Sequence, residues 1–227
     1  MKRLQSIERL DEFSVVITQN QTAGKGLRCN FWESEKDKNL TFSILLYPKF
    51  IDIQYQFRLT FIITVAIITV LKKYLTDIKI KWTNDIYVND KKLCGILIEN
   101  TVIGGQIGYS IIGIGLNINQ ITFMSNAPNP TSMKLLTNKD FDVETLFQEI
   151  KAAIIKHYSH CASVGFDDIR NIYHAHLYRN NGFHLYKDKT EVFSAKIIKI
   201  EDTGMLILVD NEGKRREYGY GEVVSFG

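Results

Sequence analysis

Residues 78–119, IKIKWTNDIYVNDKKLCGILIENTVIGGQIGYSIIGIGLNIN, decide the fold. Short apolar runs rich in Ile and Val alternate here with turn signals at Asn89-Asp90 and Gly104-Gly105. Runs of this length separated by such turns are typical of neighbouring antiparallel strands. We therefore predict an antiparallel meander at the centre of the protein.

The sequence on either side of the meander predicts the remaining elements of an α+β fold. Residues 15–18 and 41–47 are short β runs, whereas 55–74 is too long for one strand and predicts a buried helix despite its β-branched residues. Apolar residues return at helical spacing within 143–180, which predicts two helices packed on the sheet. The expected class is α+β, with a mixed, mainly antiparallel sheet covered by helices.

After Asn180-Asn181-Gly182 the helical spacing of apolar residues gives way to short β runs. Four such runs follow, with glycine-containing turns at 202–204 and 211–213, and they predict a small C-terminal β-barrel. We therefore expect two domains, residues 1–180 and residues 181–227.

Composition excludes several classes of protein. Of 227 residues 45% are hydrophobic, enough for a buried core and too many for a disordered chain. The net charge of +3 is too small to suggest nucleic acid or an anionic membrane as the main partner. The longest apolar run, residues 59–71, is shorter than the roughly 20 residues of a membrane span, and no signal peptide is visible. The three cysteines form no CxxC pair, so we expect a reducing, cytoplasmic location.

A glycine-containing basic loop, QTAGKGLRCNFW, occupies residues 21–32 after the first β run. Gly24 and Gly26 let backbone amides approach an anion, and Lys25 and Arg28 add positive charge. The loop is neither a Walker loop nor a dinucleotide-binding fingerprint. Taken alone, it fits a solvated loop almost as well as an anion site.

A second group of charged residues surrounds the first turn of the meander. Lys81 ends one run, Asn84 and Asp85 follow in the turn, and Lys92 returns antiparallel from the next turn. A carboxylate and an amide beside lysines could hold a magnesium–phosphate group. Asn and Asp are also ordinary turn formers, so this segment alone leaves both interpretations open.

The last run of the meander ends in GIGLNIN, residues 113–119. Gly113 and Gly115 leave bare backbone against which a ligand could lie, with the Asn117 amide beside it. A β-bulge would explain the glycines equally well.

The motifs taken together indicate a function more specifically than any one of them does alone. QTAGKGxR…W, KWxND, KKLxGILxE and GIGLNIN, in this order within residues 13–120, resemble the catalytic domain of biotin–protein ligases. The resemblance implies a class II aminoacyl-synthetase-like ligase fold followed by an SH3-like barrel. It also implies ATP-dependent activation of biotin as biotinyl-5′-AMP, with Mg²⁺, and transfer of biotin to a carrier-protein lysine.

The resemblance also implies roles for individual residues, by their positions in the motifs. Lys92 would be the catalytic residue, touching both the biotin carboxylate and the α-phosphate. Biotin contacts would come from Gln21, Gly24, Lys25, Gly26, Leu27, Arg28, Lys92 and Gly95. The ATP side would comprise Trp32, which stacks on adenine, with Lys81, Asn84, Asp85 and Asn117, and Asp85 would also hold the metal.

The implied partner is a biotin carboxyl carrier domain such as that of acetyl-CoA carboxylase, and a homodimer is among the arrangements that the family allows. Too few residues precede Val15 for a helix-turn-helix domain, so we expect no DNA binding. The small net charge and the short apolar run also lead us to expect no membrane partner. Four features depart from the family pattern: Thr83 in place of proline, Leu27 at a position that is often polar or basic, Cys29 in place of glycine, and no Asp-Ser-Thr-Asn motif within residues 1–20. Thr83 should be tolerated, whereas Cys29 and the missing motif predict weak retention of biotin and its adenylate. A lipoate–protein ligase-like enzyme and a non-catalytic biotin- or adenylate-binding protein are the alternatives.

Overall fold

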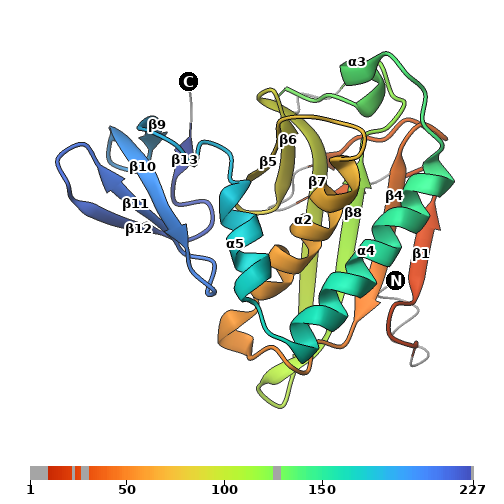
Figure 1. Cartoon of the computed structure of the whole chain (residues 1–227), viewed down its shortest axis with the longest axis horizontal. Helices are drawn as coiled ribbons and strands as arrows, with labels where there is room; N and C mark the ends of the chain where they lie inside the picture. Colours follow the sequence, from red (N-terminus) through yellow and green to blue (C-terminus); the bar gives the residue numbers. More distant parts are fainter. Residues whose placement is uncertain (1–9, 22–23, 27–30, 125–128, 226–227) are drawn as a thin grey trace.

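A six-stranded sheet forms the centre of the protein (Figure 1). The computed structural model describes residues 10–21, 24–26, 31–124 and 129–225. The strand order is β1-β4-β8-β7-β6-β5, and each neighbouring pair is antiparallel. The strands are β1 (Val15–Thr18), β4 (Leu40–Leu46), β5 (Ile78–Lys81), β6 (Asp85–Val88), β7 (Lys91–Ile103) and β8 (Gln106–Leu116). The predicted meander is confirmed as β5 to β8, and the α+β class is confirmed with it.

Both predicted hairpin turns are present. Asn89 and Asp90 connect β6 to β7 with φ values of 49° and 61°. Gly104 and Gly105 connect β7 to β8 with φ values of 60° and 80°. Two consecutive residues with positive φ match the right-handed twist of the flanking strands, so each two-residue turn sets the register of its hairpin.

Helix α2 (Arg58–Leu71) crosses one face of this sheet and follows a short 3-10 turn, η2 (Ile53–Tyr55). The helix was predicted, with wider bounds, in spite of its β-branched residues. The Thr64 hydroxyl is fully buried and donates to the Thr60 carbonyl at 2.6 Å. A buried hydroxyl is therefore tolerated, because the helix backbone itself accepts its hydrogen bond.

Helices α4 (Val143–Ser163) and α5 (Asp167–Ala175) confirm the two predicted later helices and pack beside α2 (Figure 1). Asp142 caps α4 by accepting from Thr145 N at 2.7 Å. A short helix that was not predicted, α3 (Met133–Thr137), has Ser132 as its cap. Sequence periodicity could not reveal it, since five residues are little more than one turn.

The segment Ile53–Leu71 is, by length and composition alone, apolar enough to cross a membrane. Most of it is buried inside the fold, between the sheet and the helices α4 and α5. The segment therefore matches the central helix of a folded core.

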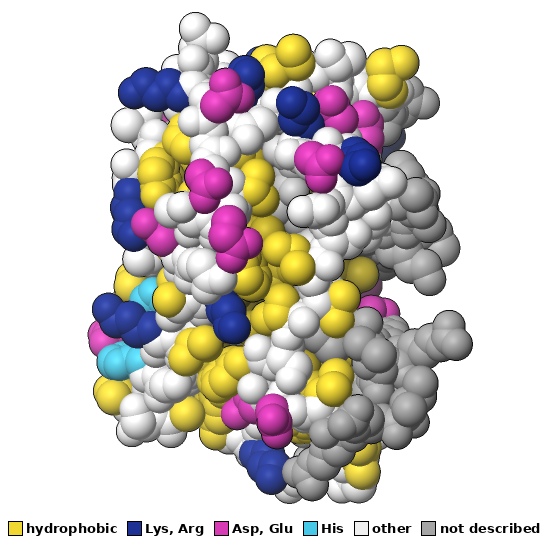
Figure 2. All heavy atoms as spheres, turned by 90° about the vertical axis from the view of Figure 1, so that its right-hand side faces the viewer, with side chains coloured by type: hydrophobic (Ala, Val, Ile, Leu, Met, Phe, Trp, Pro, Cys, Tyr) yellow, Lys and Arg dark blue, Asp and Glu magenta, His cyan; other side chains and the backbone are white. Residues whose placement is uncertain are grey.

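The two edges of the sheet differ. At one edge lies β1, where Ile17 is half exposed; Figure 2 shows this side of the molecule, with hydrophobic and charged side chains interspersed on it. At the other edge, Ile80 N of β5 donates to the His176 carbonyl at 2.7 Å, and Tyr178 N donates to the Ile80 carbonyl at 2.8 Å. The chain after α5 therefore covers the β5 edge.

The C-terminal region forms a separate five-stranded antiparallel sheet with the order β12-β11-β10-β9-β13. Its strands are β9 (His184–Lys187), β10 (Val192–Ile200), β11 (Leu206–Asp210), β12 (Arg215–Tyr218) and β13 (Val224–Ser225). This arrangement fits the expected barrel-like unit, and we call it the C-terminal sheet.

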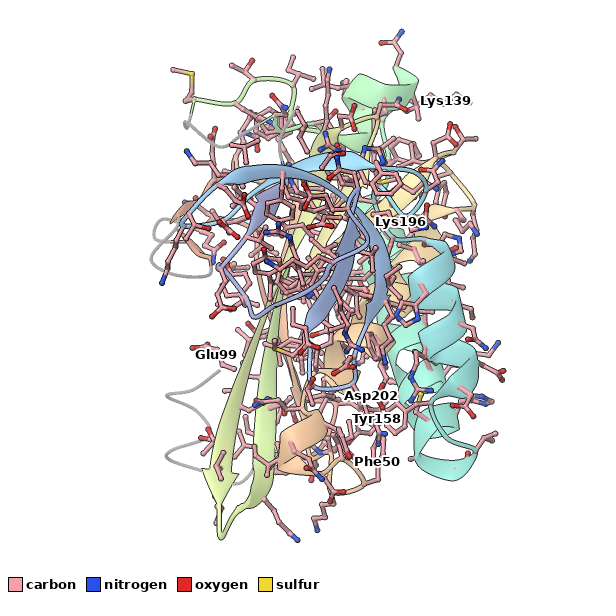
Figure 3. All side chains as sticks on the ribbon, turned by 90° about the vertical axis from the view of Figure 1, so that its left-hand side faces the viewer. Phe50, Glu99, Lys139, Tyr158, Lys196 and Asp202 are labelled. Atoms are coloured by element: carbon pink, nitrogen blue, oxygen red, sulfur yellow. The ribbon has the colours of Figure 1, made fainter. Side chains whose placement is uncertain are left out.

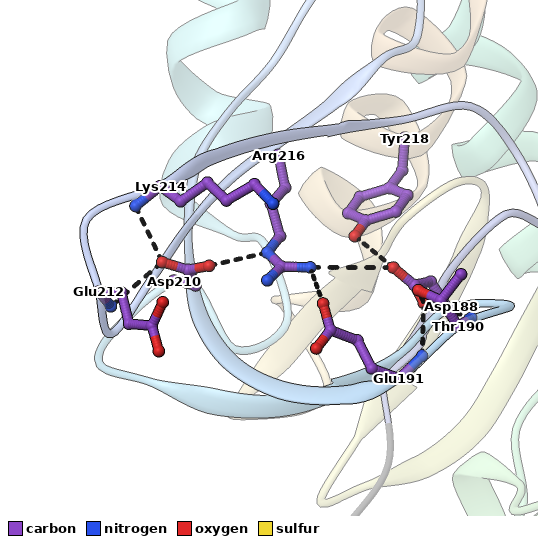
Figure 4. Close-up of polar contacts among 8 residues, drawn as sticks. All are labelled: Asp188, Thr190, Glu191, Asp210, Glu212, Lys214, Arg216 and Tyr218. Carbon is purple, nitrogen blue, oxygen red and sulfur yellow. Dashed lines mark hydrogen bonds and ion pairs between the residues drawn. The ribbon is translucent and has the colours of Figure 1, made fainter.

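Ion pairs and hydrogen bonds at one side of the C-terminal sheet meet at Arg216 (Figure 4). Its guanidinium donates to Asp210 at 2.8 Å and to Glu191 at 2.7 Å. The Tyr218 hydroxyl donates to Asp188 at 2.8 Å, and Asp188 also lies 3.9 Å from Arg216. The cluster therefore links β11 and β12 to the turn between β9 and β10 through groups that are mutually satisfied.

The hairpin between β10 and β11 fixes the C-terminal sheet to the larger sheet. Asp202, labelled in Figure 3, accepts from Arg58 at the start of α2 at 2.7 Å and from Arg170 of α5 at 2.8 Å. Two residues on, the Gly204 carbonyl accepts from the Trp82 indole N–H at 3.0 Å. Gly204 has a φ of 91°, and a side chain there would collide with the ring of Phe57.

We expect Asp202→Ala to destabilise the protein by about 2–3 kcal/mol, because it leaves two largely buried guanidinium groups without their shared carboxylate. Burial alone would raise the pKa of Asp202, but its hydrogen bonds with Arg170 and Arg58 hold that pKa below the usual range. This contribution is complete above the unfolded value of about 3.9 and is lost as the pH falls through the folded pKa. Urea titrations at neutral and acid pH measure both effects; a variant as stable as the wild type at neutral pH would contradict the role of Asp202.

Candidate active site

A pocket of 640 Å³ lies on the face of the large sheet opposite α2. Strand alternation sends most bulky apolar side chains of β4, β7 and β8 toward α2, and it sends Thr41, Ser43, the glycines and Leu97 toward the pocket. The cross-strand register places Thr41, Gly115 and Gly95 in one row, with Ser43, Gly113 and Leu97 in the next. We call Gly95, Gly113 and Gly115 the glycine platform.

The side chain of Trp32 covers part of the platform. Trp32 belongs to a two-stranded ribbon, β2 (Gly24–Lys25) with β3 (Phe31–Trp32). Its indole lies so close to Gly95 and Gly115 that a side chain at either glycine would collide with the ring. These two glycines are therefore required by a ring that packs on bare backbone, and the bulge that the sequence left open does not explain them.

Lys92 and Asp85 form an ion pair at the edge of the platform. Lys92 Nζ lies 2.7 Å from Asp85 Oδ2, and both side chains are about three-quarters buried, with 24% and 27% of their areas exposed. The Lys92 ammonium also lies 5.8 Å from the centre of the Trp32 ring. The sequence placed these two charges together across the β6–β7 hairpin, and that prediction of proximity is confirmed.

Lys81 lies beside this pair but contacts aromatic rings in place of a carboxylate. Its ammonium is 4.6 Å from the centre of the Tyr87 ring and 5.6 Å from that of Tyr178. Burial lowers the pKa of Lys81, and the nearby cations Arg179 and Lys92 lower it further, while Asp85 opposes the shift. The ammonium is thus in a place where an additional anion would stabilise its charge.

The two predicted asparagines differ in what they offer a ligand. The Asn84 amide is already engaged, since its oxygen accepts from the Thr83 hydroxyl and its nitrogen donates to the Ile96 carbonyl. Asn117 donates to the Thr131 carbonyl at 2.9 Å, while its Oδ1 is buried without a partner. Thr83, which stands where the family usually has proline, therefore holds the Asn84 side chain in place through its hydroxyl.

Three buried polar atoms around the pocket have no hydrogen-bond partner among the described residues: Gln21 Oε1, Trp32 Nε1 and Asn117 Oδ1. A buried polar atom without a partner costs about 1–3 kcal/mol, so such atoms are rare in native proteins. Two acceptors and one donor that converge on one pocket are complementary to a polar ligand.

Nine predicted site residues line the pocket: Gln21, Gly26, Trp32, Lys81, Asn84, Asp85, Lys92, Gly95 and Asn117. Gly24 is buried against Gln21 and Trp32 without lining the pocket. Leu27, Arg28, Cys29 and the side chain of Lys25 lie outside the described residues.

Sequence reasoning missed several pocket residues. Thr41 and Ser43 are the polar positions of the β4 run LTFSILL, and their spacing of two residues could have revealed them. Trp82 and Tyr220 also line the pocket, and their rings lie 6.5 Å apart. Tyr220 comes from the C-terminal sheet, about 100 residues beyond the last motif, and no sequence signal links it to the site.

Comparison with known proteins identifies the family. The model of the biotin/lipoate A/B protein ligase family matches residues 2–117, about half of the chain. The chain belongs to this family. The matched region contains every predicted site residue, and it contains all four motifs except the last two residues of GIGLNIN.

Individual relatives extend the similarity over most of the chain. The bifunctional ligase/repressor BirA of Bacillus subtilis is 29% identical over 215 residues, covering 91% of this chain and 65% of that protein. The biotin–[acetyl-CoA-carboxylase] ligase of Paracoccus denitrificans is 25% identical and covers 88% of this chain and 85% of that protein. The chain thus spans somewhat less than two thirds of the length of the Bacillus relative.

A solved structure shows the same fold. The biotin protein ligase from Aquifex aeolicus, in complex with biotin and ATP, superposes with a TM-score of 0.82 at 20% identity, covering 99% of this chain and 93% of that one. The predicted ligase fold with a small C-terminal unit is therefore confirmed for this protein.

Proposed function

We propose that this protein is a biotin–protein ligase that activates biotin with ATP and transfers it to a lysine of a carrier protein. The observation that carries the proposal is the convergence of Lys92, the glycine platform and the three unpartnered polar atoms on one pocket. The names of the Bacillus and Paracoccus relatives support it, as does the biotin and ATP bound to the Aquifex ligase.

The proposed reaction requires the protein to bring two anions together. A carboxylate oxygen of biotin attacks the α-phosphorus of ATP, the bond to the β-phosphate breaks, and pyrophosphate leaves. A carrier lysine then attacks the mixed anhydride and AMP leaves. The protein needs no nucleophile of its own for either step, and its contribution is positioning together with neutralisation of negative charge.

Lys92 is suited to this task because its ammonium is held beside the platform by Asp85. A fixed, partly buried cation stabilises the negative charge that develops on phosphate oxygens without reorganising during the reaction. The platform offers apolar surface to the ring system of biotin, and Gln21 Oε1 can accept from its ureido N–H groups, while the Trp32 ring is the proposed stacking surface for adenine. Asn117 Oδ1 can accept from the nucleotide.

Asp85 is the residue that would hold magnesium. No cluster of three or more His, Cys, Asp or Glu side chains suited to a metal occurs among the described residues. One carboxylate still fits this metal, because Mg²⁺ in nucleotide sites takes most of its ligands from phosphates and water. When bound, the ion would neutralise phosphate charge.

The proposed acceptor is a biotin carboxyl carrier domain, and the proposed location is the cytoplasm. The test is to incubate the protein with labelled biotin, ATP, Mg²⁺ and such a domain, and to measure pyrophosphate release and label on the acceptor. We expect both. Transfer of lipoate in preference to biotin would favour a lipoate–protein ligase-like enzyme, and binding of biotin without pyrophosphate release would indicate a non-catalytic binding protein.

Asp85→Asn is expected to raise the magnesium concentration needed for half-maximal activity and to weaken ATP by about tenfold, with a smaller loss for biotin. The reason is that the amide keeps the shape of the side chain and removes the charge that faces the metal. Calorimetric titrations with each ligand measure the difference. Asp140→Asn is the matched control, since that carboxylate lies in a surface ion pair with Lys134. Equal losses for both ligands would leave Asp85 as a turn residue.

A further inference from the structure

The Gln120 side chain belongs to the chain that leaves β8 and is almost fully buried, with 1% of its area exposed. Its Oε1 accepts from Glu35 N at 3.0 Å and from Asn39 Nδ2. Its Nε2 donates to Glu33 Oε1 at 3.1 Å and to the Thr122 carbonyl at 2.8 Å. A glutamine amide has two acceptor positions and two donor hydrogens, so every one of them is used here.

Three of these four partners belong to residues 33–39, the segment that directly follows Trp32. The segment lies in neither helix nor strand, so hydrogen bonds to other parts of the chain decide its position. Gln120 binds both its beginning and its end, and Asn119 N adds a bond to the Lys38 carbonyl at 2.8 Å. The chain after β8 is therefore a main support of the backbone that follows Trp32.

The same network reaches the wall of the active-site pocket. The Glu33 carboxylate, which accepts from Gln120, also accepts from Met124 N at 2.9 Å. Trp32, Glu33 and Phe123 all line the pocket, whereas Gln120 does not. Gln120 thus supports two wall segments from outside the pocket, and a change at this residue removes no group that lines it.

The other supports of the Trp32 ring are few. The strands β2 and β3 of its ribbon have two residues each, and a two-stranded ribbon is at best marginally stable by itself. The indole Nε1 has no hydrogen-bond partner among the described residues, so the ring is placed by its packing on Gly95 and Gly115 and by the direction of its backbone. Because packing contacts weaken steeply with separation, a shift of this backbone would lift the ring from the glycine platform.

We propose that Gln120 is a positioning residue for the nucleotide: by holding residues 33–35 it keeps the Trp32 indole on the glycine platform, where adenine can stack on it. The inference rests on the proposed function and extends it to a residue outside the pocket. Loss of the Gln120 amide leaves Glu35 N and Asn39 Nδ2 without this acceptor, and it leaves Glu33 with one donor fewer. The segment after Trp32 would then move to find other partners, because buried polar groups seldom stay unpaired.

Calorimetric titrations of the full chain with ATP and with biotin test the assignment. Gln120→Met keeps the length of the side chain and removes all four hydrogen bonds. We expect ATP to bind about 5- to 150-fold more weakly, the loss that corresponds to a base no longer stacked on an aromatic ring, and biotin to bind within about threefold of the wild type. Gln148→Met is the matched control, since the Gln148 amide donates to Glu144 at 2.7 Å on the exposed side of α4.

A double-mutant cycle shows whether the effect passes through Trp32. Trp32→Ala removes the ring and should itself weaken ATP. If Gln120 acts by placing this ring, adding Gln120→Met to Trp32→Ala should change the affinity for ATP by less than about twofold. The same loss of ATP affinity with and without the indole would overturn the proposal, as would wild-type ATP affinity in Gln120→Met.

A second variant separates positioning from general damage to the fold. Gln120→Glu keeps the size of the side chain and its acceptor oxygens, but it sets a carboxylate against that of Glu33 and removes both donors. It should therefore displace the same segment and show the same selective loss for ATP. If both variants lost biotin affinity as strongly as ATP affinity, Gln120 would support the whole fold, and the proposal would be wrong.

Fluorescence reports on the ring without any ligand. Tryptophan occurs only at positions 32 and 82, so the difference between each protein and its Trp32→Phe derivative isolates the Trp32 emission. We expect this emission to move to longer wavelength in Gln120→Met, because a ring lifted from the platform meets water, and to stay unchanged in Gln148→Met. Unchanged emission in Gln120→Met would also contradict the proposal.

The same measurement distinguishes failure of this inference from failure of the proposed function. If the wild type bound neither ATP nor biotin, the ligase proposal would fail, while an emission shift confined to the Gln120 variants would still assign the placement of Trp32 to Gln120. If the wild type bound and adenylated biotin while Gln120→Met changed nothing, only the role of Gln120 would be wrong.

Discussion

Replacing Lys92 by alanine should lower the rate of pyrophosphate release with biotin and ATP by about 10²–10³-fold or more. In the structure Lys92 is held at the edge of the glycine platform, beside Gly95, through its 2.7 Å contact with Asp85. The variant loses the only proposed group that faces both anionic reactants, and it leaves the Asp85 carboxylate without its partner. Stabilisation is lost chiefly in the transition state, so the rate constant should fall more than the affinity for biotin.

The neighbouring lysine supplies the control for this experiment. Lys91 precedes Lys92 on the same strand and is exposed to solvent. Lys91→Ala removes the same charge and the same side-chain atoms, and pyrophosphate release should stay within about twofold of the wild type. If Lys92→Ala released pyrophosphate at a rate close to that of the wild type, Lys92 would have no catalytic role.

A second large effect is expected when Gly115 is replaced by valine. The new side chain would collide with the Trp32 indole and cover the bare backbone of the platform. Overpacking of a close contact costs about 1–3 kcal/mol, so biotin should bind about 10- to 100-fold more weakly. Calorimetry with biotin measures the loss, and near-ultraviolet circular dichroism reports the displacement of Trp32.

Gly113 provides the comparison within the same strand. A side chain at Gly113 would meet Leu97 and Ser43 only at 3.8–4.0 Å, which is ordinary van der Waals contact. Gly113→Ala should therefore leave the Trp32 signal unchanged and weaken biotin less than Gly115→Val does. Equal biotin affinity in Gly115→Val and the wild type would show that the platform is not the biotin site.

The charged centre of the candidate site was predictable because it is local in the chain. Asp85 and Lys92 lie on adjacent strands joined by the two-residue turn Asn89-Asp90, so their approach follows from hairpin geometry. Gly113 and Gly115 were noted for their bare backbone, and the motif resemblance added Trp32. That Trp32 covers Gly95 and Gly115 was not predictable, because the ribbon β2–β3 reaches the sheet from about 60 residues earlier in the chain.

Element types and the α+β class were readable from residues alone, since apolar periodicity and turn chemistry act over a few neighbours. The helix α2 and the hairpins of β5–β8 are clear cases, whereas the single turn of α3 was too short to give a periodic signal. The assembly of the pocket depended on contacts between segments far apart in sequence. Tyr220 reaches the site because Asp202 and Gly204 dock the C-terminal sheet on Arg58, Arg170 and Trp82. No local pattern encodes such contacts, because their energy arises only when burial brings distant charges and rings together.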